Sequence, residues 1–279
     1  MKAYPSIPRV ANAPEDLFEE GHLWLFEKVD GAHVRFQLQD AGYLRFGDRN
    51  RTYDPEEVPD PYQHAVRHVQ HHLDRSTLRQ AVGDVESVVF FGEAMHRHAI
   101  DYDWARTPSF LGFDVWAEGD GFRPLDTIED IFERLGLTPV NSVAREVRAR
   151  DFDPEGYTVP QSAWYDGPAE GVVVRNKRGG RAKLLHPAFR EVDETVPVDA
   201  PAEELAEKYA TPRRFEKLAA KIEDGGEAVT VDRLARRAFE DIVREEYKQL
   251  YHGEQGVDTE TLRSEIATLA GAFLGTRNG

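Results

Sequence analysis

Hydrophobic and polar residues are arranged along the first two thirds of the chain in patterns that predict strands. Residues 34–38 alternate between apolar and polar side chains, and residues 87–91 form a β-branched and aromatic run typical of a buried strand. A loop rich in Lys, Arg and Gly at residues 176–180 separates two further runs, which we expect to pair as antiparallel strands. In all, strands are expected at residues 23–26, 34–38, 43–46, 87–91, 109–116, 170–175 and 181–185.

Beyond residue 199 the pattern changes from strands to helices. Apolar residues recur there every three to four positions among many charged ones, and proline and glycine separate the segments. The sequence therefore predicts an α+β domain at residues 1–197, followed by a small all-helical domain at residues 198–279. Helices are expected at residues 60–82, 127–135 (capped by Thr127), 202–209, 212–223, 231–251 and 259–273, with a helical turn near residues 15–20 of an extended lead-in.

Composition narrows the class of protein. The chain has 279 residues, of which 40% are hydrophobic and 10% aromatic, enough for a packed core. No run approaches the roughly eighteen apolar residues of a membrane span, and residues 1–5 lack the apolar centre of a signal peptide. The absence of cysteine excludes disulfides and thiolate zinc sites. We expect a soluble, cytoplasmic protein with no membrane segment.

The charge is strongly negative, with 51 acidic against 35 basic residues and a formal net charge of −16. The acids are spread along the whole chain, which argues against a localised interaction tail. An ordinary acidic protein has such a surface. A protein from a salt-rich cytoplasm has one as well, because high ionic strength screens the self-repulsion of an acidic surface. The composition favours the second interpretation, a halophilic origin.

One polar turn between two predicted strands carries candidate chemistry. Lys28, followed by Val29, Asp30 and Gly31, begins a Lys-x-Asp-Gly sequence. A lysine amine is a nucleophile once its environment lowers its pKa, and a glycine lets the backbone approach a ligand closely. The same four residues also form common hairpin turns, so the turn alone does not establish a site.

Other charged residues lie at the ends of the predicted strands, where they can gather around Lys28. Glu93 and Glu170 stand at strand ends, Lys183 lies in the last strand, and Arg49 follows the first hairpin. A nucleotide requires such a set: cations for its phosphates, a carboxylate for its ribose hydroxyls and oxygen ligands for its metal. Its base requires an apolar or aromatic face.

The order of these segments resembles that of a known superfamily, the covalent nucleotidyltransferases, which comprise DNA ligases, RNA ligases and mRNA capping enzymes. The resemblance rests on five segments in order: EKVDGAH, FFGEAM, FLGFDVW, EGVVVRN and RAKLLHP. Within the superfamily, residues 92–103 leading into FLGFDVW are most similar to the ATP-dependent RNA ligases. The resemblance covers residues 4–190 and implies a nucleotidyltransferase (adenylylation) fold of antiparallel sheets with flanking helices.

The resemblance implies a role for each residue of the pattern. Lys28 would attack the α-phosphate of ATP and form lysyl-AMP, and Glu93 would hold the ribose. Phe113 would stack on adenine, although an aromatic residue in a buried strand is more often part of the core. Glu170 would help to bind a catalytic Mg²⁺ or Mn²⁺, which makes pyrophosphate a better leaving group.

Further roles concern the phosphates and the substrate end. Lys183 would neutralise the α-phosphate and, with a bound metal, lower the pKa of Lys28. Arg181, where a lysine is common, would contact the nucleotide. Arg49 would contact the nucleotide or the acceptor end, unless it is a surface turn residue. His33, where an arginine or asparagine is usual, would lie at the substrate end. Nucleotide contacts are also implied for Glu27, Asp30 and Gly31.

The resemblance implies an ATP-dependent RNA ligase that joins RNA 3′-hydroxyl and 5′-phosphate ends through lysyl-AMP and RNA-adenylate. The helical pattern after residue 198 supports RNA sealing, because DNA ligases and capping enzymes usually append a small β-barrel there. DNA ligation, guanylyl transfer as in mRNA capping, and a non-catalytic nucleotide- or RNA-binding relative remain alternatives. The sequence leaves the physiological RNA and the oligomeric state open.

Overall fold

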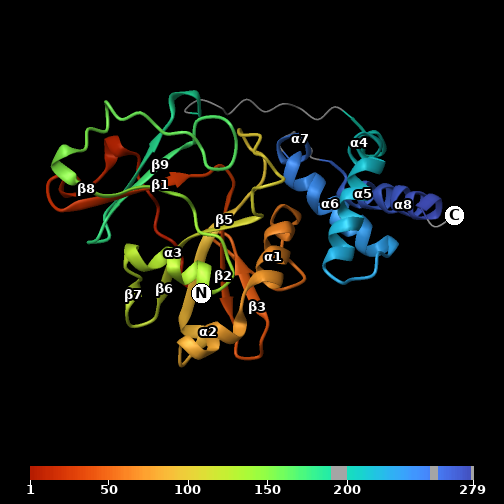
Figure 1. Ribbon diagram of the computed structural model, residues 1–279, viewed down its shortest axis with the longest axis horizontal. Helices are drawn as coiled ribbons and strands as arrows, with labels where there is room; N and C mark the ends of the chain where they lie inside the picture. Colours follow the sequence, from red (N-terminus) through yellow and green to blue (C-terminus); the bar gives the residue numbers. More distant parts are fainter. Residues whose placement is uncertain (190–199, 252–256, 278–279) are drawn as a thin grey trace. The chain divides into compact units, whose positions relative to one another are not determined.

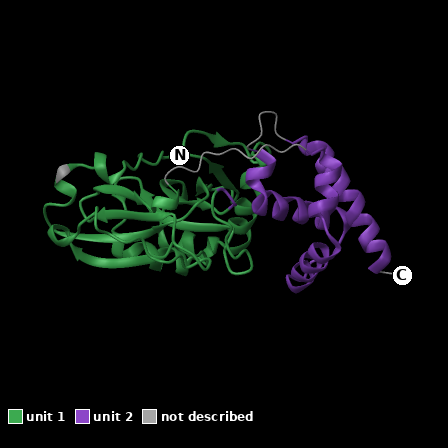
Figure 2. Ribbon diagram, turned by 90° about the horizontal axis from the view of Figure 1, so that it is seen from above, with its two compact units in different colours: residues 1–95, 99–192 green, residues 96–98, 193–279 purple. Residues whose placement is uncertain are grey.

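The structure, a computed structural model, describes residues 1–189, 200–251 and 257–277. The chain divides into two compact units, one of residues 1–95 and 99–192, the other of residues 96–98 and 193–279 (Figure 2). The domain boundary predicted at residue 197 lies outside the described residues. Each unit is described separately.

The first unit contains two antiparallel sheets (Figure 1). The smaller sheet has the strand order β10-β9-β1-β8, and its central pair places Lys28 directly opposite Gly171. Its strands are β1 (His22–Lys28), β8 (Ser142–Arg148), β9 (Gly171–Asn176) and β10 (Arg181–Leu185).

The larger sheet has the order β4-β3-β2-β5-β6-β7. In it β2 pairs with β5, so that His33 lies opposite Glu93, and β5 in turn pairs with β6. Two candidate site residues are therefore neighbours by register alone. The strands are β2 (Ala32–Leu38), β3 (Leu44–Gly47), β4 (Thr52–Tyr53), β5 (Val88–Ala94), β6 (Phe110–Ala117) and β7 (Gly121–Phe122).

Helices α1 (Asp60–His72), α2 (Arg75–Ala81) and α3 (Leu125–Arg134) cover the larger sheet. Buried aromatic and aliphatic side chains of β2, β5 and β6 pack there against apolar side chains of these helices. Because one face of the sheet is sealed in this way, its polar side chains are left for the other face. Short 3₁₀ helices lie at Val10–Asn12, Glu15–Leu17, Val85–Ser87, Ala149–Asp151 and Pro187–Phe189.

The described part of the second unit, apart from residues 96–98, is helical. Its helices bury one apolar face each in a common core that includes Phe215, Leu234, Phe239 and Ile266. Threonines cap two of them: the side chains of Thr211 and Thr230 accept hydrogen bonds from the backbone of α5 and α6. The helices are α4 (Ala202–Tyr209), α5 (Pro212–Asp224), α6 (Val231–Glu245), α7 (Tyr247–Tyr251) and α8 (Thr259–Arg277).

The predicted α+β fold class, with antiparallel sheets, flanking helices and a helical C-terminal part, is confirmed. The seven predicted strands all form, but four predicted helices have bounds that differ by more than one residue; the helix expected at 259–273 continues to Arg277. The helix expected at 60–82 is two helices, because Asp74 caps a new one. The helix expected from Thr127 begins at Leu125, since Pro124 stands at its N-cap. The helix expected at 231–251 is interrupted at Glu246.

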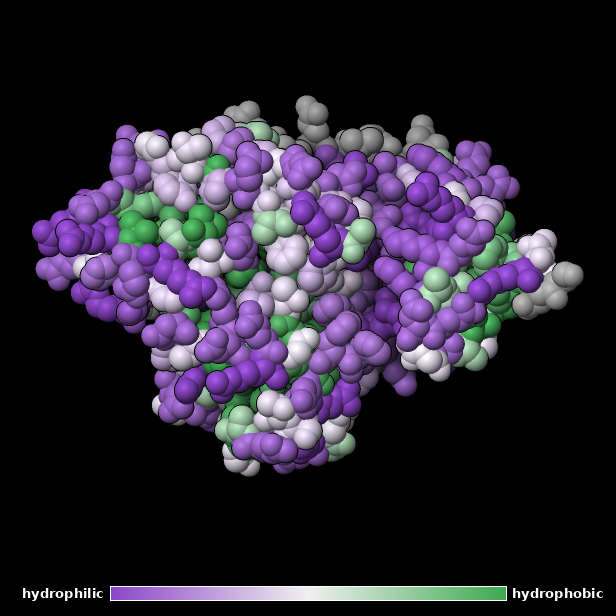
Figure 3. All heavy atoms as spheres, in the orientation of Figure 1, coloured by the Kyte–Doolittle hydropathy of each residue, from purple (hydrophilic) through white to green (hydrophobic). Residues whose placement is uncertain are grey.

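The surface shown in Figure 3 is predominantly hydrophilic, with small scattered hydrophobic areas. Charged residues make up 31% of the chain, and they form such a surface because charged side chains are rarely buried unless they are paired. Within the described residues, no helix is both long and apolar enough to cross a membrane.

Candidate active site

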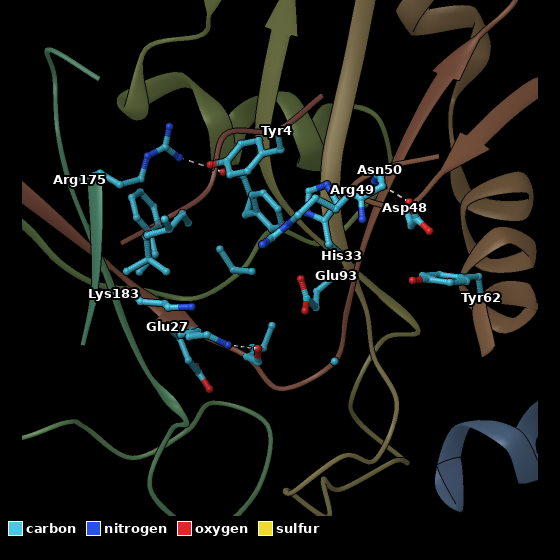
Figure 4. A pocket seen from close by; sticks show the side chains of 18 residues that line it. Tyr4, Glu27, His33, Asp48, Arg49, Asn50, Tyr62, Glu93, Arg175 and Lys183 are labelled. Atoms are coloured by element: carbon cyan, nitrogen blue, oxygen red, sulfur yellow. Dashed lines mark hydrogen bonds between the residues drawn. The ribbon is translucent and has the colours of Figure 1, made fainter. Parts of the chain in front are cut away.

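A pocket of about 440 Å³ lies in the first unit, lined by residues of both sheets. Figure 4 shows Arg175 and Lys183 on one side of it and Arg49, Asn50 and Glu93 on the other. The predicted residues that line it are Glu27, Lys28, Gly31, His33, Arg49, Glu93, Phe113 and Lys183. The structure thus brings together residues that are far apart in the sequence.

Lys28 and Glu170 form a direct ion pair at the end of the smaller sheet. The Nζ of Lys28 lies 2.6 Å from Oε2 of Glu170. The register explains this contact: Lys28 is the last residue of β1, and Glu170 immediately precedes Gly171, which is paired with it. The β1–β9 pairing therefore fixes the nucleophile candidate against a carboxylate.

The protein groups around Lys28 favour its ammonium form. Burial alone lowers the pKa of Lys28, but the nearby carboxylates Glu170, Glu93 and Asp30 outweigh burial, so this pKa lies above its ordinary value. The sequence predicted that the pKa of this amine is lowered, and Lys183 alone does not supply enough positive charge to lower it. A nucleotide-bound cation beside the carboxylates would supply that charge.

The carboxylate of Glu170 fits a divalent cation, and Glu93 lies close to it. Burial, opposed by Lys28 and reinforced by Glu170 and Asp30, raises the pKa of Glu93 to about 8. The pKa of Glu170 is raised by burial as well. Mg²⁺ is commonly held by one or two carboxylates, substrate phosphates and water. Among the described residues no three His, Asp or Glu side chains form a metal-binding group, so phosphates and water would have to complete the shell.

Asp30 and Gly31 shape the turn rather than present side chains to the pocket. Asp30 accepts hydrogen bonds from the backbone nitrogens of Ala99 (2.6 Å) and Ile100 (2.8 Å), which ties two loops together. A Cβ on Gly31 would lie 2.5 Å from the carbonyl oxygen of Ala94, so only glycine fits this position. Both residues therefore hold the loop that follows Lys28 in place.

The carboxylate of Glu27 is occupied within the protein. It is buried and accepts hydrogen bonds from the side chain of Ser162 (2.6 Å), the backbone of Ala163 (3.1 Å) and the side chain of Asn141 (3.2 Å). These contacts anchor the segment 141–163 to β1 beside the pocket. The predicted nucleotide contact by Glu27 stays a prediction, and its carboxylate already has three partners.

Lys183 and Arg49 supply positive charge to the pocket. Neither makes an ion pair with an acidic side chain in the part of the chain that the structure describes. Burial, followed by the charges of Lys28 and Arg49, lowers the pKa of Lys183. Cations placed close together without carboxylate partners are suited to hold a phosphate group.

An apolar slot adjoins these charges. Phe113, partly buried on β6, lines the pocket together with Phe26, Val140 and Val173. The ring of Phe113 also contacts His33 at a centroid distance of 5.6 Å. Such a slot can take a flat heteroaromatic base between an aromatic ring and aliphatic side chains.

Arg181 does not line the pocket. It is buried, with its Nη1 3.6 Å from Oδ2 of Asp114 and its guanidinium 4.9 Å from the ring centroid of Tyr4. Asp114, fully buried, also pairs with Arg175 at 2.7 Å and accepts a hydrogen bond from the Tyr4 hydroxyl at 3.0 Å. Since Tyr4 and Arg175 line the pocket, this network of contacts around Asp114 fixes the position of these two lining side chains. The contact between Arg181 and the nucleotide stays a prediction.

The buried network leads to a stability prediction. Asp114→Asn should lower the free energy of unfolding by about 3 kcal/mol, because two buried guanidiniums lose their counter-charge. Tyr4→Phe, which removes only one hydrogen bond to the same carboxylate, should cost about 1 kcal/mol. Urea unfolding of both variants tests this prediction. If Asp114→Asn costs no more than Tyr4→Phe, the network does not stabilise these lining side chains as described.

His33 is held in its neutral form. Burial, together with the charges of Arg49 and Arg35, lowers its pKa to about 3. Between that value and the ordinary pKa of about 6.5, the unfolded chain binds a proton that the folded protein does not, so stability falls as the pH falls. His33→Asn should therefore reduce the stability lost between pH 7.5 and pH 5 by up to about 2 kcal/mol. Urea unfolding at both pH values measures this loss; an equal loss in variant and wild type would contradict it.

Several lining residues were not among the predicted site residues: Tyr4, Ile7, Asp48, Asn50, Tyr62 and Arg175. Arg175 had a signal in the sequence, because it lies two positions after Val173 in the same predicted strand. Residues two apart in a strand share a face of the sheet, and Val173 also lines the pocket. Tyr4 had none, since its segment looks like an irregular lead-in. Taken together, a lysine against a carboxylate, free-standing cations and an apolar slot can carry out nucleotidyl transfer to a lysine.

Comparison with known proteins identifies the family of this chain. The profile described as RNA ligase matches residues 21–189, more than half of the chain. The chain therefore belongs to the RNA ligase family. A search of curated proteins gave no significant match.

Solved structures give the same fold at low sequence identity. The Naegleria gruberi RNA ligase with PPi is 14% identical, with a TM-score of 0.52 over 69% of this chain and 58% of that chain. An archaeal ATP-dependent RNA ligase in two forms is 17% and 16% identical, with TM-scores of 0.48 and 0.49 over 98% and 99% of this chain. The chain spans 63% and 66% of the length of those two archaeal chains.

Proposed function

We propose that the protein is an ATP-dependent RNA ligase that joins a 3′-hydroxyl to a 5′-phosphate through lysyl-AMP and RNA-adenylate. The observation that carries the proposal is the lysine of an RNA ligase family pocket, held 2.6 Å from Glu170 beside Lys183 and Arg49. One mutant of the Naegleria gruberi RNA ligase has been solved with ATP and Mn, and another with AMP and Mn. We propose ATP and Mg²⁺ or Mn²⁺ for this chain as well.

In the first step the amine of Lys28 attacks the α-phosphorus of ATP. A nitrogen–phosphorus bond forms, the bond from the α-phosphorus to the bridging oxygen breaks, and pyrophosphate leaves. Glu170 lies 2.6 Å from the amine and holds it in position, and a bound cation together with Lys183 would lower the pKa of the amine so that its free base attacks. Lys183 and Arg49 compensate the charge that develops on the phosphate.

A divalent cation at Glu170 would neutralise phosphate charge and weaken the hold of this carboxylate on the Lys28 proton, and Glu93 would remain free to hold the ribose. In the second step an RNA 5′-phosphate oxygen attacks the AMP phosphorus, and the amine of Lys28 leaves. The amine takes up a proton from water, and Glu170 pairs with the ammonium again. In the third step the 3′-hydroxyl attacks the activated 5′-phosphate, and AMP leaves. The pocket holds the same adenylate in all three steps.

Labelled nucleotides separate this function from its alternatives. The protein is incubated with α-labelled ATP or GTP and a divalent metal, then with nicked or single-stranded RNA and DNA. We expect a covalent adduct with ATP and joining of RNA ends. An adduct with GTP would support guanylyl transfer, joining of DNA alone would support a DNA ligase, and no adduct would support a non-catalytic relative.

We also propose that residues 1–197 form the adenylylation domain and residues 198–279 a helical domain that places the RNA end. The lining residues of the pocket all belong to the first unit. A chain ending at residue 197 should therefore still form lysyl-AMP and seal RNA at least about tenfold more slowly, since positioning of the acceptor contributes to rate. Adduct formation and sealing are measured on the same preparation. Full sealing by the shortened chain would contradict the role of the helices.

A further inference from the structure

The segment before the first strand extends the smaller sheet at its β10 edge. The backbone nitrogen of Lys183 donates a hydrogen bond to the carbonyl oxygen of Pro8 at 2.8 Å. Arg9 and Lys183 are partners in an isolated parallel bridge. Arg9 therefore lies one strand position beyond Lys183.

Register shows which face of the sheet Arg9 occupies. Side chains of residues directly opposite each other in neighbouring strands lie on the same face. Arg9 is opposite Lys183, Lys183 is opposite Val173, and Val173 is opposite Phe26. Lys183, Val173 and Phe26 all line the pocket. Arg9 is thus the outermost member of a row on the pocket face, at a strand spacing of about 4.8 Å.

The charge of Arg9 reaches the pocket. After burial, Lys28 and Arg49, the guanidinium of Arg9 is a further cause that lowers the pKa of Lys183. Arg9 is exposed and makes no ion pair with an acidic side chain in the part of the chain that the structure describes. In a chain of net charge −16, three cations without such pairs at one site indicate a ligand with several negative charges.

We propose that Arg9 binds the β- and γ-phosphates of ATP and the pyrophosphate that leaves. This inference rests on the proposed function. In an in-line displacement the leaving group departs on the side opposite the attacking amine of Lys28. Along the sheet, β10 with Lys183 and then β9 lie between Arg9 and β1, which carries Lys28. A triphosphate whose α-phosphate lies between Lys28 and Lys183 therefore extends towards Arg9.

The role is limited to the first step of the reaction and its reversal. Arg9 forms no covalent bond to the substrate. The N–H donors of its guanidinium hydrogen-bond two phosphate groups and compensate their negative charge. Lysyl-AMP and RNA-adenylate carry no β- or γ-phosphate. Transfer of AMP to RNA and the final joining should consequently not depend on Arg9.

Three assays on the full-length protein test this division. The first measures lysyl-AMP formation at subsaturating ATP, the second its reversal by inorganic pyrophosphate, and the third the joining of pre-adenylated RNA. Arg9→Ala should slow the first two about tenfold and leave the third unchanged. Arg9→Lys should recover part of the loss. Arg150→Ala removes an exposed arginine beside the opposite edge strand, β8, and serves as the matched control.

Equilibrium binding gives a readout that does not depend on catalysis. In a Lys28→Ala background, Arg9→Ala should weaken binding of ATP about tenfold while binding of AMP is unchanged. Equal loss for both nucleotides, loss confined to RNA joining, or no change in any assay would overturn the inference. A wild-type protein that forms no lysyl-AMP would instead refute the proposed function itself.

Discussion

Lys28→Ala is expected to abolish the covalent AMP adduct and the sealing of RNA. Among the described residues, the amine hydrogen-bonded to Glu170 is that of Lys28, and the variant lacks it. No other group in the mechanism forms the nitrogen–phosphorus bond, so the loss should be complete rather than partial. Intact-protein mass spectrometry after incubation with ATP and Mn²⁺ measures the adduct.

Two further variants separate the nucleophile from its charge. Lys28→Arg keeps a cation beside Glu170, but a guanidinium is not deprotonated in proteins, so this variant should also form no adduct. Lys177→Ala removes an exposed lysine of the β9–β10 turn that pairs with Glu146, and it should react like the wild type. An adduct in Lys28→Arg would show that another residue is the nucleophile.

Glu170→Gln is expected to slow lysyl-AMP formation at least about a hundredfold, in line with losses when a group that stabilises the transition state is removed. The carboxylate holds the amine of Lys28 in position and would take part in binding the divalent cation. Without it, the pKa of Lys28 should fall, because Glu170 is the largest contributor that raises this pKa. The pH at which the remaining rate reaches half its maximum should therefore be lower than in the wild type. The variant should also need a higher Mn²⁺ concentration to reach its full rate.

The combination of these effects distinguishes Glu170 from a residue that only supports the fold. Glu146→Gln, an exposed carboxylate on β8 of the same sheet, is the matched control and should leave rate, pH profile and Mn²⁺ dependence unchanged. Rate measurements from pH 6 to pH 9 at several Mn²⁺ concentrations provide the data. A wild-type rate in Glu170→Gln would remove this carboxylate from the mechanism.

The sequence predicted the parts of the fold in which local pattern and burial agree. Strands such as 87–91 are buried on both sides, and their apolar runs are hard to mistake. β8 was missed, because Ser142–Arg148 mixes polar and apolar residues, has no fully buried side chain and forms a strand by pairing with β1. Helix breaks were missed where a cap such as Asp74 outweighs the helical spacing.

The candidate site shows the same division. Lys28 and Glu93 were predicted from their places at strand ends, Lys183 from the last strand and Arg49 from the segment after the hairpin, and all four line one pocket. The network of Tyr4, Asp114 and Arg175 could not be predicted, because it depends on how an irregular N-terminal segment packs on two sheets. Long-range packing of this kind leaves no local period in a sequence. The halophilic origin and the cytoplasmic location stay predictions.

The measurement that tests the central claim most directly is the position of the adenylate on the wild-type protein. After incubation with ATP and Mn²⁺, the protein is digested without acid, and the modified peptide is sequenced by tandem mass spectrometry. The account predicts a single AMP on the peptide that contains Lys28, lost when pyrophosphate is added. An AMP attached to any other residue, or no AMP on a protein that still seals RNA, would contradict it.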